Sequence, residues 1–307
     1  MQSQVLKRLL VSFSLVLAAT ALLMPETLTA QDGLKIYISA DMEGVVGTVT
    51  GEQLGPSGFE YERARRWMTE EVNAAIRGAR AAGATEIVVS DSHGNGQNLL
   101  LDELPEDITV IRSWPRPLAM MAGIDESFDG AIFIGYHTST DNPAGVRAHT
   151  MSSARLTSVK LNGVPVPETG INAAIAGHFD VPVIMISGDD AIAEEASELL
   201  GELETAVVKQ AYGFHSAETL MPGAAYRLIE ETAKRAVRRI DEFEPWDPGG
   251  PIELEVSFKH YRPVEVLDYL EIVERIDSHT IRYRGPDMIA ISNFLTFLLN
   301  YDSNATP

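Results

Sequence analysis

The stretch Lys35-Ile-Tyr-Ile-Ser-Ala-Asp-Met-Glu-Gly44 runs from an apolar strand pattern directly into two carboxylates and a glycine. Side chains two apart on a strand point the same way, so Asp41 and Glu43 are expected to face a common space at the strand end. Neighbouring carboxylates repel each other unless a cation joins them, and a divalent metal ion is a common solution. The alternative is a solvated acidic turn. The stretch therefore predicts a candidate metal site after the first strand.

The same pattern of a buried strand followed by polar residues recurs along the chain. Helical spacing separates the strands at residues 60–79 and 191–200, and apolar strand patterns lie at residues 34–40, 85–90, 108–112, 131–135 and 181–187. Strands that alternate with helices pair in parallel, and ligands then bind at the carboxyl ends of the strands. We therefore predict an α/β fold with a mainly parallel sheet.

The remaining segments indicate a hairpin within the main domain and, after residue 220, a smaller α+β portion. Residues 158–166 alternate around Asn162-Gly163, a hairpin signal, and Glu168 begins the next helix. Further on, the pattern predicts a helix at 224–240, a strand at 252–258, a helix near 263–273 and a final helix at 287–300. We divide the chain into a metal-binding catalytic domain, residues 31–220, and a smaller C-terminal portion, residues 221–307.

The N-terminal segment, residues 1–30, has the features of a signal peptide. Lys7 and Arg8 precede an apolar run from Leu9 to Met24, which is short for a membrane span. Cleavage after Ala30 would release a soluble chain without a membrane partner, and an uncleaved anchor is the alternative. We therefore expect an exported protein, periplasmic or extracellular.

Composition limits the chemistry. The chain has no cysteine, so it forms no disulfide, and any metal must be held by oxygen and imidazole. Its formal net charge of −20 argues against nucleic acid or an anionic membrane as a partner.

Histidines are the other candidate ligands. His93 and His137 each follow a predicted strand closely, and His149 comes twelve residues after His137. Each has a structural alternative, a hydrogen-bonded histidine with no chemical role. Asp91 is interpreted either as a partner that orients His93 or as a turn cap.

Six short motifs, taken in order, resemble a known family. They are Ser-Ala-Asp-Met-Glu-Gly (39–44), Asp-Ser-His (91–93), Gly-Tyr-His (135–137), Ala-His-Thr-Met (148–151), Glu-Thr-Gly-Ile-Asn (168–172) and Gly-Asp-Asp (188–190). Together they are similar to the bacterial zinc D-aminopeptidases associated with dipeptide-transport operons, peptidase family M55. The resemblance covers nearly the whole chain after the signal peptide.

The resemblance implies that the fold is a three-layer α/β/α sandwich with a smaller C-terminal part. It also implies a zinc aminopeptidase that hydrolyses short peptides with an N-terminal D-residue and assembles as a homo-oligomer, a decamer. It implies two zinc ions per chain, bridged by Asp41 and held also by Glu43, His93, His137 and Glu168, with His149 as the catalytic residue. Whether His149 acts as acid and base or as a nucleophile stays open.

Two other functions are compatible with the same residues. A two-metal phosphoesterase also uses Asp, His and Glu at strand ends, and Arg147 is the nearest candidate for its phosphate clamp. A non-catalytic exported protein that binds peptide or metal is the other alternative.

Overall fold

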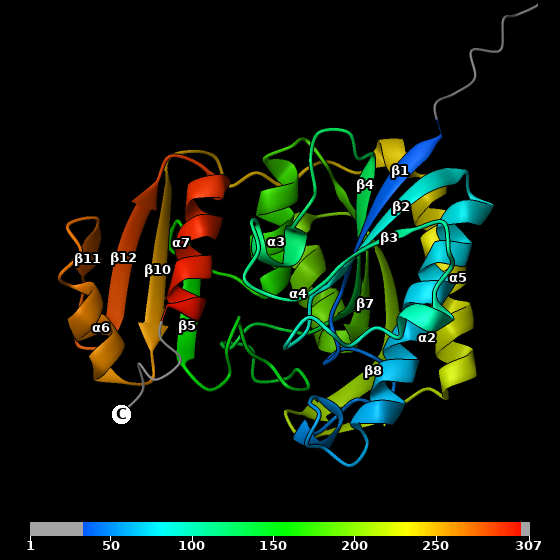
Figure 1. Cartoon of the computed structure of the whole chain (residues 1–307), viewed down its shortest axis with the longest axis horizontal. Coiled ribbons are helices and arrows are strands. Elements are labelled where there is room, and N and C mark those ends of the chain that lie inside the picture. The colour runs from blue at the N-terminus through cyan, green and yellow to red at the C-terminus, as the bar shows by residue number, and fades with distance from the viewer. Residues whose placement is uncertain (1–32, 302–307) are drawn as a thin grey trace, which may run out of the picture. The chain divides into compact units, whose positions relative to one another are not determined.

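The computed structural model describes residues 33–301, so the predicted signal peptide lies outside the described residues. Within this part the chain forms two β-sheets with helices packed around them (Figure 1). The larger sheet contains β1 (Leu34–Ala40), β2 (Ala84–Asp91), β3 (Thr109–Ile111), β4 (Gly130–Tyr136), β7 (Val183–Asp189), β8 (Glu204–Gly213) and β9 (Ser216–Thr219).

The order of strands in the larger sheet creates a site at one edge. The order is β3-β2-β1-β4-β7-β8-β9, and all neighbours are parallel except β8 and β9. The chain places β2 and β3 on one side of β1 and then returns to place β4 on the other side. Loops diverge where the order reverses, which leaves a crevice at the carboxyl ends of the strands. Asp41 follows β1 and His137 follows β4, so both lie at this crevice.

Helices cover both faces of the larger sheet, which gives three layers. The helices α2 (Tyr61–Ala81) and α5 (Pro222–Arg238) pack on one face, and α3 (Glu168–Gly177) and α4 (Asp190–Leu200) pack on the other (Figure 1). Side chains of β1 alternate between two hydrophobic cores: Ile36 and Ile38 contribute to the core beneath α2 and α5, and Tyr37 to the other. Because β1 is buried on both faces, its sequence is almost continuously apolar.

The smaller sheet is antiparallel, in the order β11-β12-β10-β5-β6. Its buried face packs against α7, which also contacts α3. The elements are β5 (Leu156–Leu161), β6 (Val164–Pro165), β10 (Ile252–Phe258), α6 (Tyr261–Leu267), β11 (Val273–Arg275), β12 (Thr280–Gly285) and α7 (Met288–Asn300). Short 3-10 turns lie at η2 (Gly51–Gln53), η3 (Leu101–Glu103), η4 (Ala119–Met121) and η5 (Ile240–Glu242).

The predicted fold class is confirmed: a mainly parallel sheet lies between helices, with a smaller antiparallel sheet beside it. The sequence did not predict β8, β9 or β12, and the helix expected near 263–273 ends at Leu267. The two sheets are also not separated in the sequence at residue 220. The hairpin β5–β6 belongs to the smaller sheet, whereas α5 packs tightly on α2, where a Cβ at Gly78 would lie 2.2 Å from the Glu230 carbonyl oxygen.

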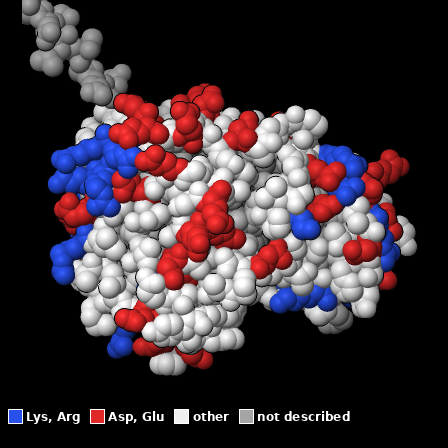
Figure 2. Space-filling model, turned by 180° about the vertical axis from the view of Figure 1, so that it is seen from behind, with Lys and Arg blue, Asp and Glu red and all other residues white. Residues whose placement is uncertain are grey.

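Charged side chains of both signs lie on the face shown in Figure 2, and many basic residues stand beside acidic ones. Arg239 pairs with Glu204 at 2.7 Å, and Arg282 pairs with Glu255 at 2.6 Å. Among residues 33–301, no helix combines the length and the apolar character needed to cross a membrane.

Candidate metal centre

The turn that carries Asp41 and Glu43 is pressed against the end of β4. The Asp41 amide donates to the Ile134 carbonyl at 2.8 Å, and the Gly44 amide donates to the Gly135 carbonyl at 2.7 Å. A Cβ at Gly44 would lie 2.0 Å from the Tyr136 carbonyl oxygen, so only glycine allows this approach. The close contact between the two backbones brings the loops after β1 and β4 together.

We expect Gly44→Ala to destabilise the fold by about 1–3 kcal/mol or more, because the new methyl group must push the two loops apart. Urea unfolding would measure the loss, and metal content should fall with it. Gly55→Ala is the matched control, since a Cβ there meets nothing within 4 Å. Equal stability of the two variants would contradict this account of the turn.

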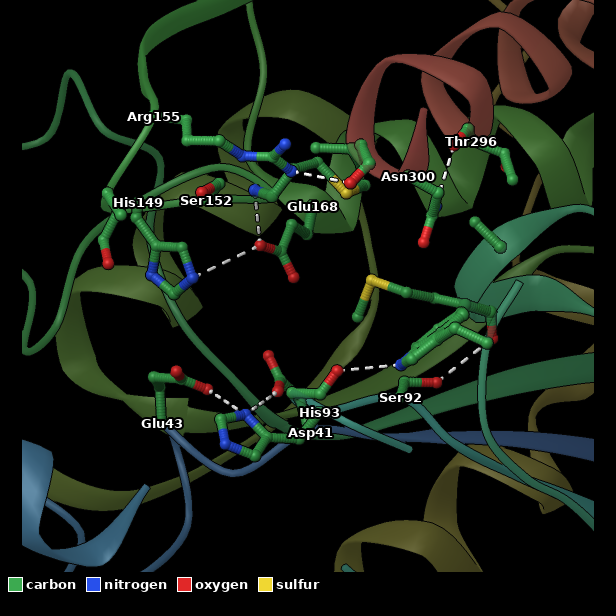
Figure 3. A pocket seen from close by; sticks show the side chains of 18 residues that line it. Asp41, Glu43, Ser92, His93, His149, Ser152, Arg155, Glu168, Thr296 and Asn300 are labelled. Carbon is green, nitrogen blue, oxygen red and sulfur yellow. Dashed lines mark hydrogen bonds and ion pairs between the residues drawn. The ribbon is translucent and has the colours of Figure 1, made fainter. Parts of the chain in front are cut away.

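The structure brings all six predicted site residues together, in two groups of possible ligands. Within each group the candidate ligand atoms lie within 4.8 Å of one another. One group contains Asp41, Glu43 and His93, and the other contains His137, His149 and Glu168. Figure 3 shows His149 and Glu168 on one side of the pocket, facing Asp41, Glu43 and His93 on the other. Five of the six are at most 6% exposed, and the side chain of His149 is 14% exposed.

Asp41 faces both groups at once. Its Oδ1 lies 3.1 Å from Nδ1 of His93, and its Oδ2 lies 3.3 Å from Nε2 of His137. Each oxygen is therefore directed to a different group. A carboxylate in this position is suited to bridge two cations.

In each of the three histidines, the ring nitrogen that points away from the site contacts a backbone carbonyl oxygen. Nε2 of His93 lies 2.8 Å from the Leu54 oxygen, Nδ1 of His137 lies 3.0 Å from the Thr138 oxygen, and Nδ1 of His149 lies 2.8 Å from the Arg147 oxygen. A carbonyl only accepts, so each of these nitrogens carries the proton. The other nitrogen, which faces the site, is then the basic one. This is the usual arrangement of a metal-binding histidine.

Hydrogen bonds from its own backbone amides hold the loop that carries His149. The His149 amide donates to the Thr138 carbonyl at 3.0 Å, and the Met151 amide donates to Oε1 of Glu168 at 2.7 Å. Arg147 and Met151 both have positive φ angles, 56° and 63°. Strained residues such as these often occur at functional sites. Together the contacts place Nε2 of His149 3.7 Å from Glu168.

The buried charges of the site fit a cation. Oδ2 of Asp41, Oε2 of Glu43 and Nε2 of His137 are buried and make no aligned hydrogen bond within the described part of the chain, only the ion-pair contacts Asp41–His137 at 3.3 Å and Glu43–His93 at 2.9 Å. Burial and the adjacent charge of Glu43 raise the pKa of Asp41. Burial acts to lower the pKa of His93, but the charges and hydrogen bonds of Glu43 and Asp41 together outweigh burial and hold that pKa well above its usual value. Metal ions bound here would satisfy these atoms and relieve the repulsion between the carboxylates.

A cavity of about 340 Å³ opens over the two groups (Figure 3). Its wall is formed by Asp41, Glu43, His93, His149 and Glu168 on the metal side and by Trp114, Met120, Met151, Arg155, Thr296 and Asn300 elsewhere. A pocket of this size, with polar groups at its base, suits a small substrate.

Other predicted residues have structural positions. Asp91 accepts from the amides of Asn98 and Leu99 at 2.6 and 2.8 Å, so it caps the turn after β2. Asp189 caps α4 by accepting from the Ile192 amide at 2.9 Å. Arg147 does not line the pocket, and its guanidinium stacks on Phe214 at 4.6 Å. Sequence reasoning missed Arg155, which lies in the pocket wall, because its partners come from distant elements.

Carboxylates and imidazoles that face a substrate-sized pocket at the edge of an α/β sheet define a metallohydrolase. The family model of the peptidase M55 D-aminopeptidases matches residues 34–297. The chain therefore belongs to this family of metallo D-aminopeptidases and is a hydrolase. This family assignment confirms the resemblance predicted from the motifs.

Two comparisons illustrate the similarity. A D-aminopeptidase of Bacillus subtilis (strain 168) is 35% identical over 257 residues, which cover 83% of this chain and 93% of the relative. A solved structure, the Zn-dependent D-aminopeptidase DppA from Bacillus subtilis, described as a self-compartmentalizing protease, matches with a TM-score of 0.83 and 33% identity. That match covers 88% of this chain and 99% of the other.

Proposed function

We propose that this protein is a two-zinc aminopeptidase that removes an N-terminal D-residue from short peptides. The observation that carries the proposal is the position of Asp41, whose two oxygens face two separate groups of candidate ligands. Asp41 together with Glu43 and His93 would hold one ion, and Asp41 together with His137 and Glu168 would hold the other. The Zn-dependence of the related DppA supports the choice of metal.

Two zinc ions at these residues would supply a polarised substrate carbonyl and an activated nucleophile. Side chains of the protein carry out the proton transfer to the leaving amine. The Nδ1–H of His149 donates a hydrogen bond to the Arg147 carbonyl, so its Nε2 faces the pocket as a base. After that nitrogen accepts the proton that the attacking water loses, the imidazolium can pass it to the leaving amine. Glu168, fixed by the Met151 amide, stands 3.7 Å from the same nitrogen and stabilises its positive charge.

A substrate panel tests the proposal. Purified protein should hydrolyse D-alanyl p-nitroanilide faster than the L-isomer, leave p-nitrophenyl phosphate intact, and contain about two zinc ions per chain. Hydrolysis of the phosphate ester alone would favour the phosphoesterase. Zinc binding without hydrolysis of any ester or anilide would favour a binding protein.

Chelation should abolish this activity and leave most of the fold intact. The two hydrophobic cores are built from sheet and helix side chains rather than from the metal ligands. Far-ultraviolet circular dichroism before and after EDTA would measure the fold, and added zinc should restore turnover. Loss of helical signal with EDTA would contradict the independence of fold and metal.

The related solved structure is described as self-compartmentalizing, and we propose that this chain also forms a homo-oligomer, as a decamer. Exposed apolar side chains support a contact surface: Tyr269 is 91% exposed and Ile272 is 63% exposed, both between α6 and β11. Analytical ultracentrifugation would measure the mass, and a monomer at micromolar concentration would refute the proposal.

We propose that the enzyme is exported to the periplasm or outside the cell. The support is the sequence of residues 1–30, with Lys7 and Arg8 before the apolar run. N-terminal sequencing of protein from the producing cells should begin near Gln31. A chain that starts at Met1 in the membrane fraction would refute export by cleavage.

A further inference from the structure

Among the described residues that line the pocket, Arg155 is the one lysine or arginine. It lies at the end of the His149 loop, directly before β5. Figure 3 shows it on the same side of the pocket as His149 and Glu168, across from Asp41 and His93. The pocket wall therefore places one cation beside the proposed reaction site.

Arg155 has no carboxylate within ion-pairing distance among residues 33–301, although the chain contains 44 acidic residues and 24 basic ones. Arg239 and Arg282, in contrast, each pair with glutamates. One Arg155 nitrogen donates to the Leu299 carbonyl at 2.8 Å. A guanidinium has several further N–H donors, so most of its binding capacity stays free for an anion.

The position of Arg155 is fixed by the smaller sheet and its helix. Its own carbonyl accepts from the Lys259 amide at 2.8 Å, just after β10, and its guanidinium is held by the last turn of α7. In the same pocket wall, the hydroxyl of Thr296 is buried without a hydrogen-bond partner in the described structure. A guanidinium held in place by a strand and a helix is prepared to bind an anion.

The proposed substrate has one matching anion. Cleavage after the first residue of a short peptide releases an amine that carries the C-terminal carboxylate one or two residues further on. One extended residue spans about 3.5 Å, so this carboxylate stays within a pocket of the observed size. Arginine binds carboxylates in a bidentate geometry that a neutral amide cannot reproduce.

We propose that Arg155 binds the free C-terminal carboxylate of the substrate and thereby selects very short peptides, dipeptides above all. The inference rests on the proposed aminopeptidase function and adds to it the part of the substrate beyond the scissile bond. Arg155 acts on specificity, and the proton transfer stays with His149.

The test compares three substrates, D-Ala-Gly, its C-terminal amide and D-alanyl p-nitroanilide, of which only the first has a carboxylate. For the wild type, amidation should lower kcat/KM about 50-fold, mainly through KM. Arg155→Met should lower kcat/KM for D-Ala-Gly by the same factor and change the amide and the anilide by less than about twofold. Arg155→Lys should lie between. Lys160→Met, which removes a charge in β5 outside this pocket, is the control.

Equal losses on all three substrates in Arg155→Met would show a structural role and overturn the proposal, as would no loss on D-Ala-Gly. A binding measurement separates this inference from the proposed function. Calorimetric titration of D-Ala-Gly and its amide into zinc-loaded His149→Ala should show tighter binding of the free acid, and Arg155→Met should remove the difference. Tighter binding of the free acid by a protein without any peptidase activity would refute the proposed function and support the carboxylate site. Equal binding of acid and amide would sink the site.

Discussion

His149→Ala is expected to lower kcat by on the order of 10²-fold or more while both zinc ions stay bound. The side chain is outside the proposed ligand set, and its Nε2 is the base that faces the pocket. Removing it takes away the proton transfer to the leaving amine and leaves the ligands in place. Steady-state kinetics together with zinc analysis of the same preparation measure both quantities.

His137→Ala is the control, since it removes a proposed ligand and should lose zinc first and rate as a result. The two rings stack with centroids 4.1 Å apart, so both variants remove an imidazole from the same place. His149 also belongs to one of the two ligand groups by distance. If His149→Ala loses zinc as readily as His137→Ala, then His149 is a ligand; full activity of His149→Ala would reject the mechanism.

Lys209→Met is expected to destabilise the protein by about 3 kcal/mol or more. The ammonium group is buried and donates to the carbonyls of Glu43, Val45 and Thr48, the last at 2.6 Å. Methionine fills a similar volume and leaves these three carbonyls without their donor. Urea unfolding at fixed pH measures the change.

Glu71 on α2 contacts the same loop, since it accepts from the Val46 amide at 2.8 Å. Burial raises the pKa of Glu71 to about 8 and lowers the pKa of Lys209 to about 8. The two groups together hold the loop that follows the predicted ligand Glu43. Lys160→Met, at a partly exposed position in β5, is the control and should change stability by less than about 0.5 kcal/mol. A comparable loss in both variants would contradict the role of Lys209.

The sequence predicted the strand ends well because local patterns carry that information. An apolar run followed by Asp41 or His137 marks a buried strand and the loop after it, and parallel pairing places such loops at one edge. The same logic placed His93 beside them. The close approach of Gly44 to β4 follows from contacts between residues far apart in the chain, which no local pattern records.

The missed features depend on pairing over long distances in the sequence. Arg155 gains its place from Lys259 and Leu299, more than a hundred residues away. Lys209 interrupts the apolar pattern from which the strand β8 would be predicted. It is present because its ammonium group donates to carbonyls of the loop after β1. The position of α5 on α2 likewise depends on the fit between two helix surfaces rather than on either sequence alone.

The proposed metal ligands lie far in the sequence from the strand and the helix that complete the pocket, and this has a consequence for biosynthesis. All six predicted site residues precede residue 170, whereas the strand that pairs with β5 begins at Ile252 and the helix that holds Arg155 begins at Met288. A chain growing from its N-terminus therefore contains every predicted metal ligand long before its carboxylate-binding wall can form. During that interval the β5–β6 hairpin lacks its neighbour β10, and an unpaired strand edge can join other chains. Fragments that end before residue 252 should accordingly aggregate when they are expressed, even though they carry the complete set of proposed ligands.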